Sequence, residues 1–278
     1  MKHFEFKLKT FDGLSLFGQS WQPEDQPRAV VCLVHGMGEH SGRYVHVADR
    51  LTKAGYIIFA FDLRGHGRSE GQLGHSPSYE VLLHDIGFLL GEAEKHFPQL
   101  PRFLYGHSLG GNLVLNYVLR RKPELKGAVT TGPWLRLAFE PPAFKVILAK
   151  VTNQIWPSFS QISGLDTKAI SRDPEVVRAY ENDPLGHDHI SARMFIGVYQ
   201  AGQWSLEHAS ELPIPLLLMH GGDDKLSSVK ASREFADKVT EKCTLKIWDG
   251  LYHEIHSEPE KEEVFKFLID WLDKKVSE

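Results

Sequence analysis

The chain has 278 residues, 42% hydrophobic and 24% charged, as in a globular protein and unlike a disordered, collagen-like or disulfide-scaffold chain. This length approaches the upper limit for one cooperative core, so we expect one domain with an inserted lobe rather than two independent domains. Lys and Arg total 32 against 36 Asp and Glu, a net charge of −4 with no basic cluster, which argues against nucleic acid as a partner.

The cysteines and the N-terminal segment indicate the compartment. Cys32 and Cys243 lie in apolar, strand-like runs, which is typical of small buried side chains rather than of a disulfide or metal site. The first ten residues alternate charged and apolar types, and apolar runs such as 29–34 are too short to cross a bilayer. We therefore expect a cytoplasmic protein without an export signal or transmembrane segment.

The predicted strands begin with a hairpin. Strands at 3–9 and 14–21 are joined by Asp12-Gly13, a dipeptide that suits a tight turn. After a proline-rich break, short apolar runs recur, and each resembles a strand buried on both faces. These runs are 29–34, 56–61, 103–105, 127–130, 214–219 and 244–248.

Segments of helical period separate most of these strands, so the pattern predicts an α/β fold with a parallel sheet covered by helices on both faces. The predicted helices are 42–54, 78–96, 110–121, 229–240 and 259–275. The alternation is lost between Thr131 and Pro213. We interpret 133–207 as a mostly helical insertion over the sheet, with helices at 144–155 and 190–207, and 1–132 with 208–278 as the core.

A G-x-S-x-G motif, Gly106-His107-Ser108-Leu109-Gly110, lies between a predicted strand and a predicted helix. This is the context that a nucleophilic serine requires, because the sharp turn leaves room only for glycine at the flanking positions. The alternative, a glycine-rich turn without a catalytic role, is disfavoured by that context. Ser108 is thus the candidate nucleophile.

A serine nucleophile needs a histidine to accept its proton and a carboxylate to orient that histidine. In α/β-hydrolases the acid and then the base follow the serine along the chain. Asp223 and Asp224 come directly after the strand 214–219, and His253 follows the strand 244–248. Spacing does not choose between the two aspartates, and it leaves His256 as an alternative to His253.

The oxyanion of acyl transfer needs two backbone N–H donors. Leu109, the residue after the nucleophile, is expected to supply one, and Met37, in the turn after the strand 29–34, the other. We expect His35 to brace that turn rather than to act in catalysis.

Four segments together resemble the monoacylglycerol lipase and lysophospholipase group of α/β-hydrolases over nearly the whole chain. They are H-G-M-G-E-H-S-G-R-Y at 35–44, D-L-R-G-H-G-R-S-E-G at 62–71, G-H-S-L-G-G at 106–111 and Y-H-E at 252–254. The resemblance implies the α/β-hydrolase fold, with a mostly parallel sheet flanked by helices and a mainly helical cap. The group's G-x-x-D-[KR] segment matches 221–225 and selects Asp224, and its Y-H-E segment selects His253.

The chain departs from the group in two places. Leu109 stands where methionine is frequent, which is harmless if only its N–H is used, and pocket-lining cysteines of the animal enzymes have no evident counterpart. The chain thus resembles a bacterial-type member, and substrate identity does not transfer across so divergent an insertion.

The predicted helix at 144–155 places Phe144, Ile147, Leu148 and Val151 largely on one face. One interpretation is a helix packed on the sheet. The other, implied by the resemblance, is a lid whose apolar underside lines an acyl tunnel and whose rim contacts lipid aggregates or a membrane surface. These four residues are therefore the candidates for substrate binding.

No metal or cofactor site is predicted. His187-Asp188-His189 lacks a third ligand and suits a turn, and the segment 65–71 lacks the residues of a phosphate-binding loop. We predict a serine carboxylic-ester hydrolase that cleaves monoacylglycerols. The alternatives are a lysophospholipase or broad carboxylesterase, and then a peptidase, an acyltransferase or a non-catalytic binding protein of the same fold.

Overall fold

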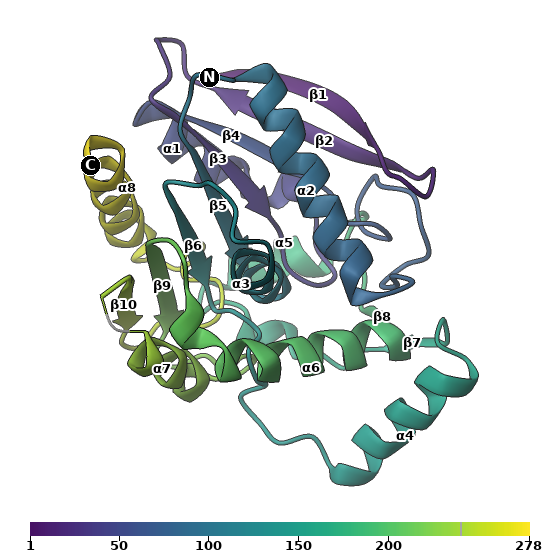
Figure 1. Cartoon of the computed structure of the whole chain (residues 1–278). Helices are drawn as coiled ribbons and strands as arrows, with labels where there is room; N and C mark the ends of the chain where they lie inside the picture. The colour runs from purple at the N-terminus through teal and green to yellow at the C-terminus, as the bar shows by residue number, and fades with distance from the viewer. Residues whose placement is uncertain (240) are drawn as a thin grey trace.

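A computed structural model describes residues 1–239 and 241–278, which form one mixed sheet of eight strands with helices on both faces (Figure 1). The strand order is β1-β2-β4-β3-β5-β6-β9-β10. The hairpin strands β1 and β2 run antiparallel, and the strands from β4 to β10 are mutually parallel. The bounds are β1 (Lys2–Lys9), β2 (Ser15–Gln22), β3 (Ala29–Val34), β4 (Tyr56–Phe61), β5 (Arg102–His107), β6 (Gly127–Thr131), β9 (Leu216–Gly221) and β10 (Cys243–Trp248).

The predicted α/β class and the antiparallel opening are confirmed, and the strands of the main sheet differ from the prediction only at their ends. The strand predicted at 214–219 begins at Leu216, because Pro215 has no N–H to donate to a sheet. The strand predicted at 103–105 continues to His107, so it ends at the residue before Ser108. The sheet therefore leads directly into the candidate site.

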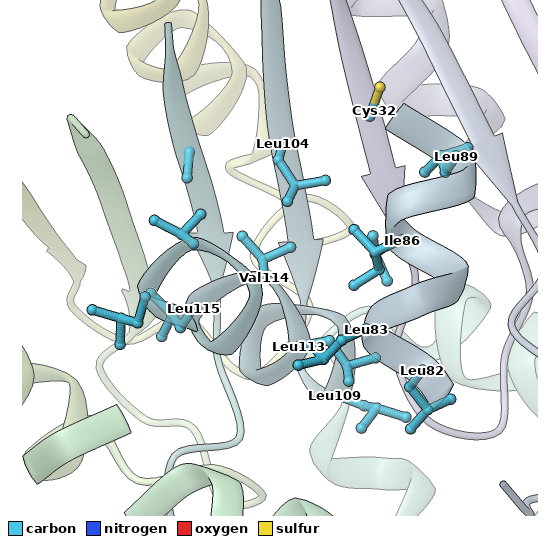
Figure 2. Close-up of a cluster of buried hydrophobic side chains, with 14 of the residues drawn as sticks. Cys32, Leu82, Leu83, Ile86, Leu89, Leu104, Leu109, Leu113, Val114 and Leu115 are labelled. Atoms are coloured by element: carbon cyan, nitrogen blue, oxygen red, sulfur yellow. The ribbon is translucent and has the colours of Figure 1, made fainter. Parts of the chain in front are cut away.

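Helices cover the two faces of the sheet and build two apolar layers. On one face, α2 (Tyr79–His96), α3 (Leu109–Arg121) and α7 (Val229–Lys238) bury apolar side chains. Figure 2 shows Leu83 of α2 and Leu113 of α3 in the same buried cluster as Leu104 of β5. On the other face, α1 (Val45–Lys53) and α8 (Lys261–Ser277) bury Leu51 and Phe265. Burial on both faces explains why inner strands such as β3 and β4 are entirely apolar.

Two predicted helices differ in detail. The helix predicted at 42–54 is a 3-10 turn, η1 (Ser41–Tyr44), followed by α1. The helix predicted at 229–240 ends at Lys238, and Thr240 lies outside the described residues.

Residues 133–207, the segment predicted to be an insertion and called the insertion below, contribute no strand to the main sheet among their described residues. Figure 1 shows α4 and α6 beyond the arrowheads of β5 and β6. Its elements are α4 (Ala143–Ile155), β7 (Ser160–Ile162), η2 (Thr167–Ala169), α5 (Pro174–Glu181), β8 (His189–Ser191) and α6 (Ala192–Glu207); η3 (Ala209–Glu211) then leads back to β9. The sequence prediction missed β7, β8 and α5. The N-terminus of α5 is marked by Asp173, which caps the N–H of Glu175, and by Pro174 in the first turn.

Buried asparagines attach α6 to the helix that follows Ser108. Asn112 Nδ2 donates to the carbonyl of Val198, and Asn116 Nδ2 donates to the Ala201 carbonyl and to Ser205 Oγ at 2.8 Å. Both asparagines are fully buried, so these bonds replace the water that the side chains lose on folding. They keep α6 at a constant position over α3.

The helix α4 stands apart from the main sheet. None of its residues is buried, and it packs on α6 instead. The interpretation of this segment as a helix packed on the sheet is therefore wrong. Phe144, Ile147 and Leu148 are each more than 60% exposed, and Val151 is 45% exposed.

No helix in residues 1–239 or 241–278 is both long enough and apolar enough to cross a membrane.

Candidate active site

Ser108 occupies a strained turn between β5 and α3. Its backbone has φ 53° and ψ −113°, a conformation that L residues adopt only when the surrounding structure enforces it. A Cβ at Gly106 would lie 2.2 Å from the carbonyl oxygen of Gly110, and a Cβ at Gly110 would lie 2.0 Å from that of Val34. Both glycines are thus required, and the turn places Ser108 at the N-terminus of α3, where backbone N–H groups point toward anionic groups.

Asp224 and His253, from the loops after β9 and β10, are joined by a hydrogen bond. His253 Nδ1 lies 2.7 Å from Asp224 Oδ2. Asp224 Oδ1 accepts from the backbone N–H groups of Leu226 and Ser227 at 2.8 and 3.0 Å, which fixes the carboxylate plane. Asp223 is exposed, and its N–H donates to the Leu251 carbonyl. The geometry thus distinguishes the two neighbours that spacing alone left equal.

The pKa values follow from this arrangement. Burial opposes ionisation of Asp224, but the adjacent His253 and His220 outweigh that effect and hold its pKa well below the usual range. Burial alone would lower the pKa of His253, but the Asp224 carboxylate outweighs burial, so the pKa is raised. The pair is therefore suited to stabilise an imidazolium next to an ionised carboxylate.

Ser108 and His253 line the same cavity, together with His107. Among the described residues no hydrogen bond joins the Ser108 hydroxyl to His253, a contact that in enzymes without substrate is often long and tightens in the Michaelis complex. The His107 ring centroid lies 4.7 Å from that of His253. Burial, reinforced by the His253 charge, lowers the pKa of His107 to about 3, so His107 stays neutral and does not compete for the proton.

The turn expected to supply an oxyanion donor is held by a buried glutamate. Glu39 Oε1 accepts the N–H of Gly36 at 2.6 Å and the hydroxyl of Tyr44 at 2.7 Å. A Cβ at Gly36 would lie 3.2 Å from Ser108 Cβ, so the turn approaches the serine closely. Met37 lines the cavity beside Ser108, and Leu109 begins α3. The two residues expected to donate N–H groups are thus the neighbour of Ser108 in the chain and a residue of the same cavity wall.

The cavity beside Ser108 has a volume of about 320 Å³, within the range of small-molecule sites. Apolar side chains form much of its wall, and most come from the insertion. These apolar side chains are Met37, Trp134, Leu137, Phe139, Leu165, Ala169, Ile170, Ile190, Phe195 and Leu226.

The predicted substrate-binding side chains lie elsewhere. Phe144, Ile147, Leu148 and Val151 are absent from the cavity wall, and their side chains are exposed on α4. The expectation of an acyl tunnel under this helix therefore needs correction. The physical reason is that α4 packs on α6 at a distance from the sheet, so the segments flanking it reach the cavity instead.

Other singled-out histidines have structural positions. His35 Nε2 accepts the N–H of Leu63 at 2.8 Å, as expected for a brace of the turn. His187 Nε2 lies 3.1 Å from the Gly65 carbonyl, and its Nδ1 accepts the N–H of His189, so hydrogen bonds hold this segment where it leads into β8. His256 stacks on Tyr44 and has no polar contact with Asp224 among the described residues.

Sequence reasoning did not predict how several side chains support the site. Arg43 joins Glu39, at 3.2 Å, to Glu254, which it contacts through Nη2 at 2.9 and 3.1 Å. His220 Nε2 lies 2.9 Å from Asp224 Oδ2, and its Nδ1 lies 2.7 Å from Ser232 Oγ. The segment 35–44 contained Glu39 and Arg43, but one sequence does not reveal which residues a charged side chain will meet.

Relatives of the chain are found over nearly its full length. A family model described as "Serine aminopeptidase, S33" matches residues 25–260. The chain is 38% identical to the monoacylglycerol lipase of Mycolicibacterium smegmatis, covering 94% of this chain and 93% of that protein. It is 34% identical to human monoglyceride lipase, covering 97% and 90% of the two chains. It is also 39% identical to an uncharacterized abhydrolase domain-containing protein of Dictyostelium discoideum, of which it spans only 29%.

Solved structures agree with these relationships. The crystal structure of Paleococcus ferrophilus monoacylglycerol lipase superposes with a TM-score of 0.83 at 35% identity, covering 100% of this chain and 99% of that one. A soluble variant of the Saccharomyces cerevisiae monoglyceride lipase, in complex with a substrate analog, superposes with a TM-score of 0.87 at 28% identity and covers 99% and 96%.

The fold and the strand-to-helix serine define the class of protein: this is a serine hydrolase of the α/β-hydrolase fold. The relatives narrow that class. The chain belongs to the monoacylglycerol lipase family of α/β-hydrolases.

Proposed function

We propose that the protein hydrolyses monoacylglycerols to fatty acid and glycerol, with Ser108 as nucleophile, His253 as general base and acid, and Asp224 as the group that orients His253. The observation that carries this proposal is the apolar cavity that reaches Ser108 and lies beside the Asp224–His253 pair. A single acyl chain gains about 0.8 kcal/mol for each buried CH₂, so such a cavity suits one fatty acyl group.

The reaction proceeds in two acyl transfers. Ser108 Oγ attacks the ester carbonyl while His253 Nε2 takes the hydroxyl proton, and the N–H groups of Met37 and Leu109 stabilise the oxyanion. Collapse of the tetrahedral intermediate breaks the ester C–O bond, and His253 protonates the departing glycerol oxygen. Water then attacks the acyl-serine with its proton passing to His253, and the return of that proton to Ser108 frees the fatty acid and regenerates the enzyme.

The charges around the cavity support a neutral head group. Asp166 and Asp188 line the cavity with a single lysine, Lys225, while the carboxylates of Glu39 and Glu254 are already paired with Arg43. A phosphate group near these acids would be repelled, whereas glycerol hydroxyls can donate hydrogen bonds to carboxylates. This favours a monoacylglycerol over a lysophospholipid.

We also propose that residues 133–207 act as a cap whose outer surface contacts lipid aggregates. Several large apolar side chains are exposed together on α4 and the chain that flanks it, and large exposed apolar patches mark interaction surfaces. This apolar patch consists of Phe139, Phe144, Ile147, Leu148, Val151, Ile155, Trp156 and Phe159. Lys145 and Lys150 are also exposed on α4, away from its apolar face, and would reach lipid head groups at the edge of the patch.

A substrate panel with a serine variant tests the proposed function. We expect wild-type protein to hydrolyse monooleoylglycerol at least tenfold faster, in kcat/KM, than lysophosphatidylcholine or an aminoacyl anilide. Ser108→Ala should lose labelling by a fluorophosphonate and reduce turnover by about 10³–10⁶ while it unfolds at the same temperature. Preference for the lysophospholipid or the anilide would overturn the substrate assignment, and more than a percent of activity in Ser108→Ala would overturn the mechanism.

A further inference from the structure

The insertion is attached to the loop of His253 by a short ladder of hydrogen bonds. The backbone N–H of Glu254, the residue after His253, donates to the Ile170 carbonyl at 2.8 Å. Two residues further along the insertion, the backbone N–H of Arg172 donates to Glu258 Oε1 at 2.8 Å, and Arg172 Nε donates to Glu258 Oε2 at 2.5 Å. The segment 170–172 is thus held along the loop 254–258.

Glu258 is the buried member of this junction. Its side chain is 0% exposed, whereas that of Arg172 is 34% exposed. Within residues 1–239 and 241–278, the Glu258 carboxylate accepts hydrogen bonds only from Arg172. A buried carboxylate depends on its ionic partner, so separation of the two segments would leave an uncompensated charge in the interior. The pair therefore holds the two segments at one relative position.

These contacts continue to the turn 35–38, which contains Met37 and is called the oxyanion turn below. Glu254 is bound on its other side by Arg43, which also contacts Glu39, and Glu39 accepts the N–H of Gly36. The loop of His253 is thus supported by the insertion on one side and by the oxyanion turn on the other. Loosening the contact with the insertion therefore removes one of the two supports of Glu254, while the hydrogen bond between His253 and Asp224 remains.

The same segment forms part of the cavity wall. Ala169 and Ile170 line the cavity and are each 2% exposed. A substrate in the cavity would contact Ile170, whose carbonyl is bonded to the residue after His253. The wall that receives the substrate and the loop that carries the imidazole are therefore one connected unit.

We propose that Glu258 is a positioning residue, which fastens the insertion to the loop of His253 and so keeps the imidazole in place relative to Ser108 and the cavity wall. This rests on the proposed role of His253 as the general base. Glu258 does not contact the reacting atoms, and its effect passes through the backbone of the loop 254–258. Displacement of a reacting group by about 1 Å can reduce turnover by up to about 10²-fold. Loss of the Arg172–Glu258 pair, which we call the clamp, should therefore lower kcat measurably.

The test compares Glu258→Gln and Arg172→Gln with wild type on p-nitrophenyl butyrate, a short soluble ester. We expect each variant to lower kcat about tenfold with little change in KM, because positioning of the base is impaired and not binding. We also expect the acid limb of the kcat/KM pH profile to move to lower pH in both variants, because a loosened loop weakens the contact of His253 with Asp224.

The pH profile separates positioning from simple charge effects. Removing the negative charge of Glu258 and removing the positive charge of Arg172 would shift the titration of a nearby imidazole in opposite directions. Shifts in opposite directions, or kcat within about twofold of wild type in folded protein, would overturn the proposal. Thermal unfolding is measured for both variants. If Glu258→Gln does not fold, the kinetics of Arg172→Gln, at the more exposed end of the pair, test whether the pair positions His253.

A matched control removes the same charge from an exposed pair. Glu262, on α8, forms an ion pair with Arg50 and is 60% exposed. Glu262→Gln should leave kcat and the pH profile unchanged, and a loss equal to that of Glu258→Gln would count against a specific role for Glu258. Ser108→Ala is assayed alongside: activity retained there would refute the proposed function itself, whereas an inactive Ser108→Ala with an unaffected Glu258→Gln would refute only the clamp.

Discussion

Replacement of Asp224 by asparagine tests the proposed mechanism most directly, because the structure dictates how the new amide must lie. Oδ1 accepts two backbone N–H groups, from Leu226 and Ser227. The amide nitrogen of asparagine cannot occupy that position, since a donor would face two donors. The amide nitrogen must then replace Oδ2, which lies 2.7 Å from His253 Nδ1.

The consequence is a change of tautomer. Facing an amide N–H, His253 Nδ1 must accept a hydrogen bond, so the imidazole proton moves to Nε2. An imidazole protonated at Nε2 cannot take the proton of Ser108. Loss of the correct tautomer costs about 10⁴-fold in kcat, which corresponds to about 5 kcal/mol of transition-state stabilisation.

Steady-state hydrolysis of p-nitrophenyl butyrate gives kcat and KM for Asp224→Asn and for a control variant, Asp223→Asn. The rate of fluorophosphonate labelling reports on the reactivity of Ser108. Asp223→Asn is the matched control, since this neighbour is exposed and its described hydrogen bond uses only the backbone N–H. We expect Asp224→Asn to lose about four orders of magnitude in kcat with KM little changed, and Asp223→Asn to stay within about twofold of wild type.

Two results would refute the reasoning. Retention of more than about 1% of wild-type kcat in Asp224→Asn would mean that the carboxylate does not set the tautomer of His253. Equal losses in the two variants would mean that the carboxylate of the exposed neighbour also acts, against the contacts seen here. Unfolding temperatures of both variants establish that the comparison is made on folded protein.

Two further outcomes are expected. Because Asp224 outweighs burial and raises the pKa of His253 above its ordinary 6.5, kcat/KM for a soluble ester should fall on acidification with a midpoint above pH 6.5; a midpoint below 6 would contradict the ion pair. The double variant Ile147→Ser/Leu148→Ser should bind phosphatidylcholine vesicles roughly tenfold more weakly in a sedimentation assay, with p-nitrophenyl butyrate hydrolysis unchanged. Phe4→Ser, a 50% exposed position on β1, is its control, and equal losses of binding would argue against the apolar patch.

Much of the core architecture was predictable from local sequence. Strands buried on both faces must be almost wholly apolar, and β3 and β4 end where the runs 29–34 and 56–61 end. The G-x-S-x-G turn could also be predicted from the sequence, because steric crowding admits only glycine at Gly106 and Gly110. These features depend on neighbours in the chain, so the chain alone reveals them.

The location of α4 was not predictable from the sequence, because an apolar helical face is compatible with several different packing partners. The same spacing of Phe144, Ile147, Leu148 and Val151 suits a buried helix, a tunnel wall or a lipid-facing surface. The structure places the helix on α6 with this face exposed, and the cavity is lined instead by residues of irregular segments such as 163–166. Irregular segments carry no periodic signal, so periodicity could not identify them.

The order of Ser108, Asp224 and His253 along the chain was determined by sequence, together with the segments that resemble a known family. Only the tertiary structure decided what supports them. Glu258 is one of 36 acidic residues, and nothing in its local sequence marks it as buried or as the partner of Arg172. Long-range pairs of this kind depend on where the folded backbone brings distant segments together, and that is a property of the fold as a whole rather than of any local segment.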